Sequence, residues 1–302
     1  MHRFVKNNQV LKFLKRLLPT KRLYNSSITK PNPKHVAVIM DGNGRWANAQ
    51  GLSRIAGHKK GADSVKAIIK GCLQHEIPYL SIFAFSSENW NRSSNEVNAL
   101  MDLLSNALET QTKKLNENGV RLQFIGDLDK FSERIQSLAK DAQAQTINND
   151  KLVLSVAINY GGRWDITQAC KQLATKVASG EINPLDIDEN LISQHLSTTG
   201  IPDPDLFIRT SGEYRISNFF LWQAAYAEFY FVDTLWPDFD AQAFTEALLK
   251  YSRRDRRFGK ATDKLTVDAG DVTMISPQQA NQQSEPEHIS DLSTGPQYKK
   301  LE

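Results

Sequence analysis

The sequence predicts an α/β fold, in which helices flank a central and largely parallel β-sheet. Two observations lead to this prediction. Short apolar runs of strand length alternate with longer segments that repeat apolar residues at helical spacing, which is the pattern of parallel strands joined by helical crossovers. The alternating region runs from residue 35 to residue 259 of the 302-residue chain, a length that suits one large domain.

Each expected helix and strand follows from its residue pattern. The strands are apolar runs bounded by turn-forming residues, and we expect them at residues 35–40, 79–85, 120–125, 152–158, 205–209 and 229–232. The helices repeat apolar residues every three or four positions, and we expect them at residues 57–76, 94–118, 131–147, 163–178, 189–196 and 241–257. Gly119 and Gly180 follow two of these segments, where glycine commonly ends a helix.

Charge divides the chain into three regions. Residues 1–34 form a basic arm with nine Lys or Arg and no acid, whereas residues 260–302 form a polar tail with four Lys and seven acids. Residues 35–259, the expected folded domain, carry a net charge of −3. This body lacks the basic character that nucleic acid binding needs, so we expect no nucleic acid partner. The tail has few core-forming residues and is predicted to be disordered.

The basic arm repeats apolar residues at helical spacing, as an amphipathic helix does. This pattern suits peripheral contact with an anionic membrane surface. An organellar targeting presequence or an arm without a role are the alternatives. The longest apolar stretch, residues 219–232, is too short and too polar to span a bilayer. Cys72 and Cys170 show no metal-binding or disulfide spacing, which favours a reducing compartment and a cytoplasmic protein, at the inner face of the membrane if the arm binds lipid.

The most informative stretch is the first strand and the turn that follows it. The apolar run stops at Asp41, and the chain then turns through Gly42, Asn43 and Gly44 to Arg45. Glycines let the backbone approach a ligand closely. Backbone N–H groups and arginine bind phosphate oxygens, and a carboxylate can hold the divalent cation that accompanies them. The alternative is a strand with an ordinary Asp-Gly turn.

Further cations follow this turn. Arg54 and His58 lie just before and at the start of the next expected helix, and Trp46 lies beside Arg45. A helix N-terminus also favours anions. Several cations around one glycine turn suit a diphosphate better than a monophosphate, although Arg54 alone is equally well explained by a surface salt bridge.

A polar cluster follows the second strand. Because neighbouring strand ends face one crevice in such a sheet, its hydroxyl, amide and guanidinium groups are expected to position a substrate and relay a proton. The alternative is a polar loop that leads to a helix N-cap. The cluster comprises Ser86, Ser87, Glu88, Asn89, Trp90 and Arg92.

A third motif follows the strand at residues 205–209. Arg209 ends that strand, and a glycine-containing loop then presents Arg215, Ile216 and Ser217. Two arginines beside one backbone turn are suited to a second diphosphate. A solvated charged hairpin is the alternative.

One acid stands alone in an apolar segment. Glu228 lies within the run Ala224–Phe231, where an unpaired carboxylate would be costly. Together with Asp41 it could hold Mg²⁺, which needs only one or two carboxylates plus substrate phosphates. A buried structural ion pair is the alternative. No phosphate-binding motif of the nucleotide-binding classes is present.

Seven motifs in fixed order resemble one known family, the cis-prenyltransferases, and most closely their bacterial undecaprenyl diphosphate synthases. The resemblance covers residues 35–259. Its motifs are long and specific, and they read HVAVIMDGNGRWA, GHKKGA, AFSSENWNR, NYGGRWDI, IRTSGEYRISNFFLWQ, YAEFYF and WPDF.

The resemblance implies a function and partners. It implies a homodimeric, Mg²⁺-dependent transferase with an elongated hydrophobic tunnel. Such an enzyme adds isopentenyl diphosphate repeatedly to farnesyl diphosphate with cis double bonds, giving a long-chain product such as undecaprenyl diphosphate, the lipid carrier precursor for cell-wall glycans. Residues of Val97–Leu108 and Leu152 are the expected tunnel wall, and the sequence does not give the product length.

The resemblance also implies residue roles. Asp41 corresponds to the catalytic, magnesium-linked aspartate, Asn89 to the proton acceptor and Glu228 to the second magnesium ligand. The segment Arg257–Gly259 corresponds to a motif at the dimer interface. The allylic diphosphate site corresponds to Gly42, Asn43, Gly44, Arg45, Trp46, Arg54 and His58, substrate positioning to Ser86, Ser87, Glu88, Trp90 and Arg92, and the isopentenyl diphosphate site to Arg209, Arg215, Ile216 and Ser217.

Two other functions compete with this interpretation. One is a non-catalytic subunit of a heteromeric prenyltransferase, which would not need Asp41, Asn43 or the arginine pair. The other is a magnesium-dependent phosphatase or nucleotide-binding enzyme, which would have no use for a hydrophobic tunnel.

Overall fold

The structure is a computed structural model, and it describes residues 31–254. These residues form one six-stranded sheet with the order β3-β4-β2-β1-β5-β6. Every neighbouring pair of strands is parallel, which confirms the predicted α/β class. The strands are β1 (His35–Ile39), β2 (Tyr79–Ser86), β3 (Val120–Ile125), β4 (Leu152–Tyr160), β5 (Leu206–Arg209) and β6 (Glu228–Phe231).

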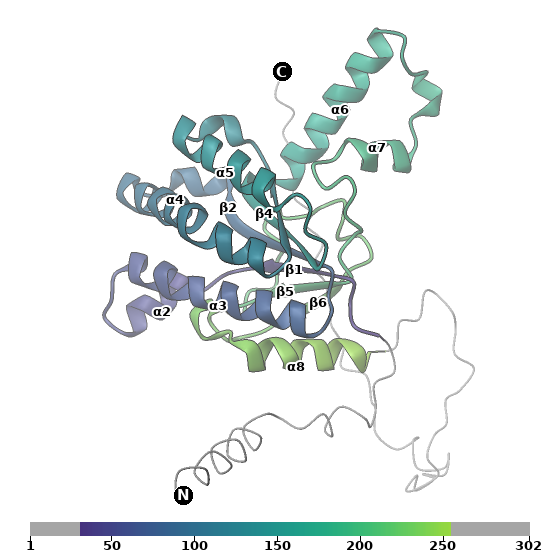
Figure 1. The fold of residues 1–302 in the computed structure, drawn as a ribbon. Helices are drawn as coiled ribbons and strands as arrows, with labels where there is room; N and C mark the ends of the chain where they lie inside the picture. Colours follow the sequence, from purple (N-terminus) through teal and green to yellow (C-terminus); the bar gives the residue numbers. More distant parts are fainter. Residues whose placement is uncertain (1–30, 255–302) are drawn as a thin grey trace, which may run out of the picture. The chain divides into compact units, whose positions relative to one another are not determined.

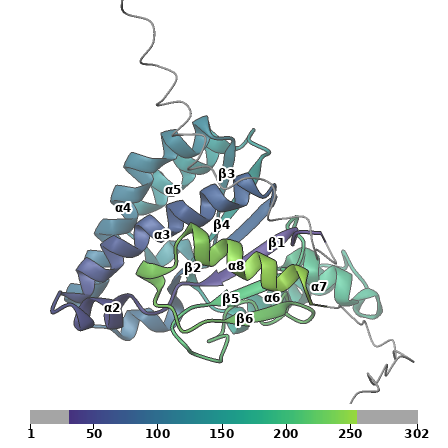
Figure 2. The same cartoon turned by 90° about the horizontal axis from the view of Figure 1, so that it is seen from below.

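Helices cover both faces of this sheet. The helices α3, α4, α5 and α8 lie together on one face, whereas α6 and α7 project on the other side (Figures 1 and 2). The helices are α2 (Asn43–Ala49), α3 (Arg54–Gln74), α4 (Ser94–Glu117), α5 (Glu133–Thr146), α6 (Gly162–Ala178), α7 (Glu189–His195) and α8 (Ala241–Ser252).

Two hydrophobic cores fill the layers. The larger core joins alternate strand residues such as Val36, Val38 and Leu80 to the four helices on one face. The smaller core lies on the opposite face, where Phe219 and Phe220 pack against the strands. This alternation follows from the two-residue period of a strand, which sends successive side chains to opposite faces.

The structure corrects the prediction around the first glycine turn. The sequence predicted a turn through Gly42, Asn43 and Gly44, but α2 begins directly after Gly42, which adopts a left-handed φ of 109° as its N-cap. The next helix, α3, also begins at Arg54 rather than at residue 57, because the Ser53 side chain accepts a hydrogen bond from the Ala56 N–H. The short α2 was missed because its seven residues give too little periodicity to recognise.

Glycines let α3 approach the start of α2. A Cβ atom at Gly57 would lie 2.1 Å from the carbonyl oxygen of Asn43, and one at Gly61 would lie 2.3 Å from its Oδ1 atom. Neither approach tolerates a side chain, so both glycines are needed for this packing. The contact holds Asn43 beside His58, which lies one residue after Gly57 on α3.

His35 gives the fold a pH-dependent stability. It is 1% exposed, and its ring nitrogens contact the Pro202 carbonyl oxygen at 2.6 Å and Ser81 Oγ at 2.8 Å. Burial lowers the pKa of His35 to about 4. His35 therefore takes up a proton near pH 6.5 in the unfolded chain but only near pH 4 in the folded chain. As a result, the free energy of unfolding falls by about 3 kcal/mol as the pH drops from 6.5 to 4.

The measurement is the free energy of unfolding in urea between pH 7 and pH 5. The difference between the wild type and His35→Gln is expected to shrink as the pH falls, because only the wild type loses this contribution. A difference that stays constant over this range would contradict the assignment.

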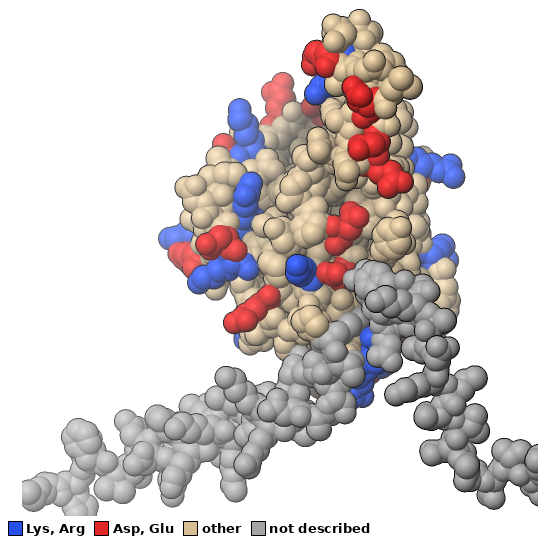
Figure 3. All heavy atoms as spheres, turned by 90° about the vertical axis from the view of Figure 1, so that its right-hand side faces the viewer, with Lys and Arg blue, Asp and Glu red and all other residues tan. Residues whose placement is uncertain are grey.

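Several predictions concern residues outside the described range. They are the amphipathic arm of residues 1–34, apart from its last four residues, the tail of residues 260–302, and the segment Arg257–Gly259. Among the described helices, none is long and apolar enough to cross a membrane. Figure 3 shows several acidic side chains along the upper part of the face where α6 and α7 lie.

Candidate active site

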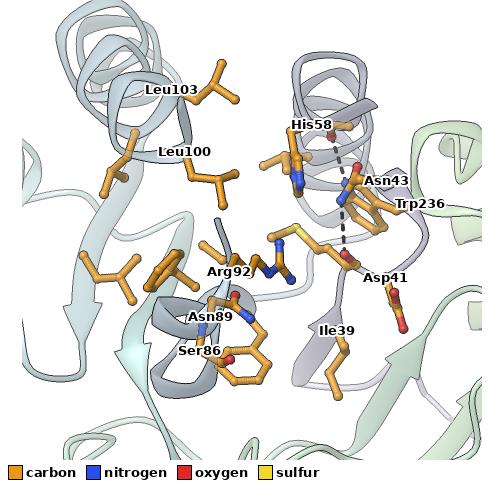
Figure 4. A pocket seen from close by; sticks show the side chains of 18 of the residues that line it. Ile39, Asp41, Asn43, His58, Ser86, Asn89, Arg92, Leu100, Leu103 and Trp236 are labelled. Atoms are coloured by element: carbon orange, nitrogen blue, oxygen red, sulfur yellow. Dashed lines mark hydrogen bonds between the residues drawn. The ribbon is translucent and has the colours of Figure 1, made fainter. Parts of the chain in front are cut away.

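A pocket of about 710 Å³ opens at the carboxyl ends of the strands, between α3 and α4. Its polar end carries Asp41, Asn43, His58, Asn89 and Arg209. Figure 4 shows His58 on α3 facing Leu100 and Leu103 of α4 across this space. Segments that are far apart in the sequence therefore meet at one edge of the sheet, as expected for a parallel α/β fold.

Asp41 lies directly beyond β1, and β5 fixes its backbone. Thr210 Oγ1 accepts a hydrogen bond from the Asp41 N–H at 3.0 Å and donates one to the Asp41 carbonyl oxygen at 2.6 Å. The Trp236 N–H donates to the same carbonyl at 3.0 Å. Burial alone would raise the pKa of Asp41, but the hydrogen bond and charge of Arg209, with the charge of Arg45, lower it below its usual value. Asp41 is therefore a carboxylate at neutral pH.

Arg209 connects Asp41 to the loop after β5. It is 4% exposed, and its Nη2 lies 2.9 Å from Asp41 Oδ2 while Nη1 donates to Ser217 Oγ at 2.7 Å. Nη1 also donates to the carbonyl oxygen of Arg215. The arginine thus orders the loop, in which Ser217 has a left-handed φ of 47°. Such strain is typical of functional loops.

The predicted second arginine of this loop points differently. Arg215 is exposed and pairs with Glu213, so it lies at the rim rather than in the pocket. Ile216 packs against the smaller core and anchors the loop. Ser217 lines the pocket together with Arg209. The structure therefore brings Arg209 and Ser217 together. Arg215 could reach an anion in the pocket only after breaking its ion pair with Glu213.

Arg45, on α2, also reaches the Asp41 carboxylate. Its Nη1 donates to the Ser211 carbonyl oxygen at 2.9 Å, and Nη2 lies 3.2 Å from Glu213 and 3.6 Å from Asp41. Arg45 and Arg209 therefore flank one carboxylate. Trp46 instead points away, where its indole N–H donates to Asp238 Oδ1 at 2.8 Å.

A second cation group surrounds Glu96 on the first turn of α4. Arg92 Nη1 lies 2.9 Å from its Oε1 and Arg54 Nε lies 3.3 Å from its Oε2. His58 Nε2 lies 3.7 Å from Oε1. Gly44 permits this arrangement, because a Cβ there would lie 3.3 Å from the Arg54 guanidinium.

The structure corrects the expected charge of His58. Burial lowers the pKa of His58, and the positive charges of Arg92 and Arg54 lower it further against the opposing effect of Glu96. In the absence of a bound anion the imidazole is therefore neutral at pH 7, and the cations here are the two arginines. Its charge could not be predicted from the sequence because it depends on neighbours that are distant in the chain.

Glu96 is a residue that the sequence interpretation missed. It stands three positions after Ser93, the N-cap of α4, where an acid is commonly explained by helix capping. Glu96 follows Arg92 by four residues, but Arg92 lies before the N-cap of α4, so helical spacing gave no signal that the two side chains would pair.

The polar cluster after β2 forms a short 3-10 helix, η2 (Ser87–Asn91). The Ser86 N–H donates to Asn89 Oδ1 at 3.1 Å, and Ser86 and Asn89 both line the pocket. Asn218 Nδ2 donates to Glu88 Oε1 at 2.9 Å, which ties η2 to the loop after β5. Burial opposes ionisation of Glu88, but this hydrogen bond and others lower its pKa overall. Ser87 faces Gly161, where a Cβ would lie 2.9 Å from its hydroxyl.

Asn159 fixes Trp90 and with it the position of η2. It is 3% exposed and adopts a left-handed φ of 47°. Its Oδ1 accepts from the Trp90 indole N–H at 2.9 Å, and its Nδ2 donates to the Asp127 carbonyl at 2.8 Å. Trp90 also packs edge-on against Phe85 at 5.0 Å between ring centroids. Asparagine suits this place because it tolerates the left-handed region and offers both a donor and an acceptor.

Asn159→Leu is expected to lose both hydrogen bonds and to lower stability by about 2 kcal/mol, because the part-buried Trp90 donor and Asp127 carbonyl lose their partners. The measurement is the urea midpoint together with the emission wavelength of Trp90 in a variant that keeps only that tryptophan. Asn159→Asp, which retains only the acceptor, is expected to keep the emission of Trp90 closer to that of the wild type. Unchanged emission in Asn159→Leu would contradict the role.

The structure does not bring Glu228 to Asp41. Glu228 pairs with Leu206 on β5, and Leu206 pairs with Val36 on β1, so Glu228 lies at the amino ends of the strands while Asp41 lies beyond their carboxyl ends. Its Oε2 is 3.7 Å from Arg254 Nη1. The expectation that these two acids share one pocket is wrong for a single chain.

The apolar end of the pocket is lined mainly by α4. Leu100, Met101, Leu103 and Leu104 contribute to it, as the sequence predicted for this helix. Leu152, the other expected wall residue, does not line the pocket and is fully buried in the larger core. The same strand contributes Ile158 instead, because Leu152 opens β4 at the end of the sheet away from the pocket mouth.

The oxygen atoms around Asp41 fit a Mg²⁺ ion whose remaining ligands come from the phosphates of a substrate. Within residues 31–254 there is no group of three or more His, Cys, Asp or Glu that could hold a metal. Both arginine contacts of Asp41 go to Oδ2, which leaves Oδ1 for another ligand. Asn43 Oδ1, also at the pocket, is buried with no hydrogen-bond partner. One carboxylate and phosphate oxygens are a usual ligand set for Mg²⁺.

Comparison with known proteins gives consistent matches. The Prenyltransf family model, described as "Putative undecaprenyl diphosphate synthase", matches residues 39–259. A relative from Legionella pneumophila (strain Paris), named ditrans,polycis-undecaprenyl-diphosphate synthase ((2E,6E)-farnesyl-diphosphate specific), is 54% identical over 228 residues, which cover 76% of this chain and 96% of that protein. An isoprenyl transferase from Nitrosomonas europaea is 51% identical over 244 residues, covering 81% of this chain and 92% of its own.

Solved structures agree with the sequence matches. The crystal structure of lavandulyl diphosphate synthase from Lavandula x intermedia, in complex with dimethylallyl diphosphate, has a TM-score of 0.74 and 40% sequence identity, covering 76% of this chain and 99% of its own. A probable undecaprenyl diphosphate synthase from Campylobacter jejuni has a TM-score of 0.64 and 32% identity, covering 76% of this chain and 100% of its own.

Proposed function

We propose that this chain, which belongs to the undecaprenyl diphosphate synthase family of cis-prenyltransferases, elongates farnesyl diphosphate with isopentenyl diphosphate. The product would be a long-chain polyprenyl diphosphate such as undecaprenyl diphosphate. The observation that carries the proposal is the pocket itself, which joins the Asp41–Arg209 pair at its polar end to the leucines of α4 at its apolar end.

The allylic diphosphate would bind between the start of α2 and the start of α3. Arg54 and Arg92 supply positive charge there, and the amide of Asn43 and the imidazole of His58 line the pocket. These groups would stabilise the charge that develops as the diphosphate leaves carbon 1 of the allylic substrate.

The isopentenyl diphosphate would bind beside Arg209. This arginine and Ser217 line the pocket, and Arg45 and Arg215 lie at the rim within reach of a second diphosphate if they leave Glu213. Binding on this side would direct the double bond of isopentenyl diphosphate toward carbon 1 of the allylic partner, so that its terminal carbon forms the new bond.

Asp41 would hold Mg²⁺ together with diphosphate oxygens. When bound, the ion would supply charge neutralisation for the leaving diphosphate. Glu228 has no part in this arrangement within one chain. The low pKa of Asp41 keeps its carboxylate available as a ligand throughout the neutral pH range.

Asn89 is better suited to orienting a substrate than to accepting a proton. Its Oδ1 already accepts a hydrogen bond from the Ser86 N–H, and a carboxamide is a weak base. Its NH₂ group remains to donate to a diphosphate oxygen. We assign the proton lost from the new allylic carbon to the departing diphosphate, which is the stronger base next to that carbon.

The apolar end would receive the growing chain. Each buried CH₂ group favours elongation by about 0.8 kcal/mol, and Leu100 and Leu104 of α4 give the chain an apolar wall. A homodimer is part of the proposal. The strand β6 is one edge of the sheet, and the partly buried Phe229 and Phe231 stack there with their ring centroids 5.7 Å apart, which is a surface that a second copy could cover.

The test incubates the purified full-length chain with farnesyl diphosphate, radiolabelled isopentenyl diphosphate and Mg²⁺, followed by chromatography of the products. A ladder ending in a long polyprenyl diphosphate with cis double bonds is expected, and EDTA should prevent its formation. Release of phosphate without carbon–carbon bond formation would instead indicate a phosphatase. A chain that needs a second subunit for any turnover would indicate a non-catalytic partner.

A further inference from the structure

Glu96 lies behind the polar end of the pocket, where one carboxylate joins three separate segments. Arg54 and His58 come from the first two turns of α3, and Arg92 comes from the end of the loop before α4. The Glu96 carboxylate lies within 3.7 Å of a nitrogen atom in each of them. It therefore bridges the two helices that form the sides of the pocket.

Helix capping does not explain the position of this side chain. Ser93 accepts a hydrogen bond from the Glu96 N–H at 3.4 Å, so the backbone of Glu96 takes part in the cap. Its carboxylate is turned instead toward the three basic residues, and the side chain is only 11% exposed. Burying a carboxylate is costly, and the two arginines beside Glu96 offset that cost.

We propose that Glu96 is a positioning residue that holds Arg54, His58 and Arg92 in the arrangement that receives the allylic diphosphate. The proposal rests on the proposed function. Each guanidinium carries five N–H donors, and Glu96 contacts one nitrogen atom of each arginine. The remaining donors stay available for phosphate oxygens, so Glu96 orients the arginines without consuming them.

Charge balance gives the physical reason. Two guanidinium groups beside one imidazole repel each other, and the Arg54 side chain is 56% exposed, so it has solvent to turn into. A carboxylate between them offsets this repulsion and fixes long side chains that otherwise have many rotamers. If Glu96 instead repelled the incoming diphosphate, its removal would raise the affinity for farnesyl diphosphate rather than lower it.

The experiment compares Glu96→Gln and Glu96→Ala with the wild type, using the full chain. The value of kcat/KM for farnesyl diphosphate is expected to fall by about 10- to 100-fold, because misplaced binding groups weaken transition-state alignment. The KM for isopentenyl diphosphate, whose proposed site lies at Arg209, should change less than about twofold. Calorimetric titration with farnesyl diphosphate alone should show weaker binding.

Glu109→Gln is the matched control. Glu109 lies on the same helix and pairs with Arg134 at 2.7 Å on an exposed surface, so its loss should leave both substrates unaffected. Tighter farnesyl diphosphate binding in Glu96→Gln, or unchanged allylic parameters, would overturn the proposal. Equal losses for both substrates with a lower Tm would also overturn it, because they indicate a structural role only. A wild-type chain that binds farnesyl diphosphate but forms no carbon–carbon bond would refute the proposed function and leave the titration as a test of Glu96.

Discussion

Asp41→Ala is expected to lower the rate of chain elongation by about a thousandfold or more while the fold remains intact. Asp41 lies at the junction of the two proposed diphosphate sites, where its carboxylate lines the pocket and pairs with Arg209. Removing it deletes both the proposed ligand for Mg²⁺ and the anion that orients Arg209. Losses of this size are typical when charge stabilisation at a reacting centre is removed.

Asp41→Asn tests the effect of the carboxylate charge separately from that of the side-chain volume. The asparagine keeps the volume and one acceptor for Arg209, so it should destabilise the fold less than alanine, which leaves a buried guanidinium without its anion. Both variants should lack elongation activity, because neither offers a carboxylate to the metal. The measurements are initial rates with radiolabelled isopentenyl diphosphate and the Tm of each variant. Substantial turnover in Asp41→Ala at saturating Mg²⁺ would defeat the proposed mechanism.

Arg209→Lys is expected to lower kcat/KM for isopentenyl diphosphate by about 100-fold, although the charge is kept. Arg209 reaches Asp41 with one terminal nitrogen and Ser217 with the other. A lysine ammonium is a single point of charge and cannot bridge both partners and a diphosphate at the same time. The loop that carries Ser217 in its left-handed conformation would then lose its anchor.

Arg215→Lys is the matched control for this prediction. Arg215 is 62% exposed on its side chain and pairs with Glu213 at the rim, so the same exchange should cost much less there. The measurements are KM and kcat for each substrate in both variants. If Arg209→Lys raised the KM for farnesyl diphosphate more than that for isopentenyl diphosphate, the assignment of the two diphosphates to the two arginine groups would be reversed.

Most of the fold could be predicted from the sequence because the buried faces of strands and long helices appear as local periodicity of apolar residues. The strand β3 begins and ends where its apolar run does, and α4 follows its leucine spacing within one residue. The short α2 could not be recognised, because the glycines around it suggest a turn and its seven residues cover only two helical turns. Its formation depends on Gly57 and Gly61, which are distant in the sequence and allow α3 to pack against it.

The active site was predictable where function follows from position at the end of a strand. Asp41 follows the apolar strand β1 and Arg209 ends the apolar strand β5, and parallel strands bring such residues to one edge of the sheet. The prediction failed for Glu228 because this residue begins its strand rather than following one. The apolar residues around it do not indicate at which end of the strand it lies. Glu96 and Asn159 were missed because their partners, Arg54 and Trp90, are contacts that no local pattern encodes.

The amino-acid sequence by itself determined the alternation of strands and helices and the family to which the chain belongs, because both are written in local periodicity and in contiguous motifs. Only the tertiary structure decided which charged groups meet, that His58 is neutral beside two arginines, and that Glu228 lies at the far end of the sheet from Asp41. The physical reason is that electrostatic interactions depend on distance in space and on burial, and both are set by how remote segments pack.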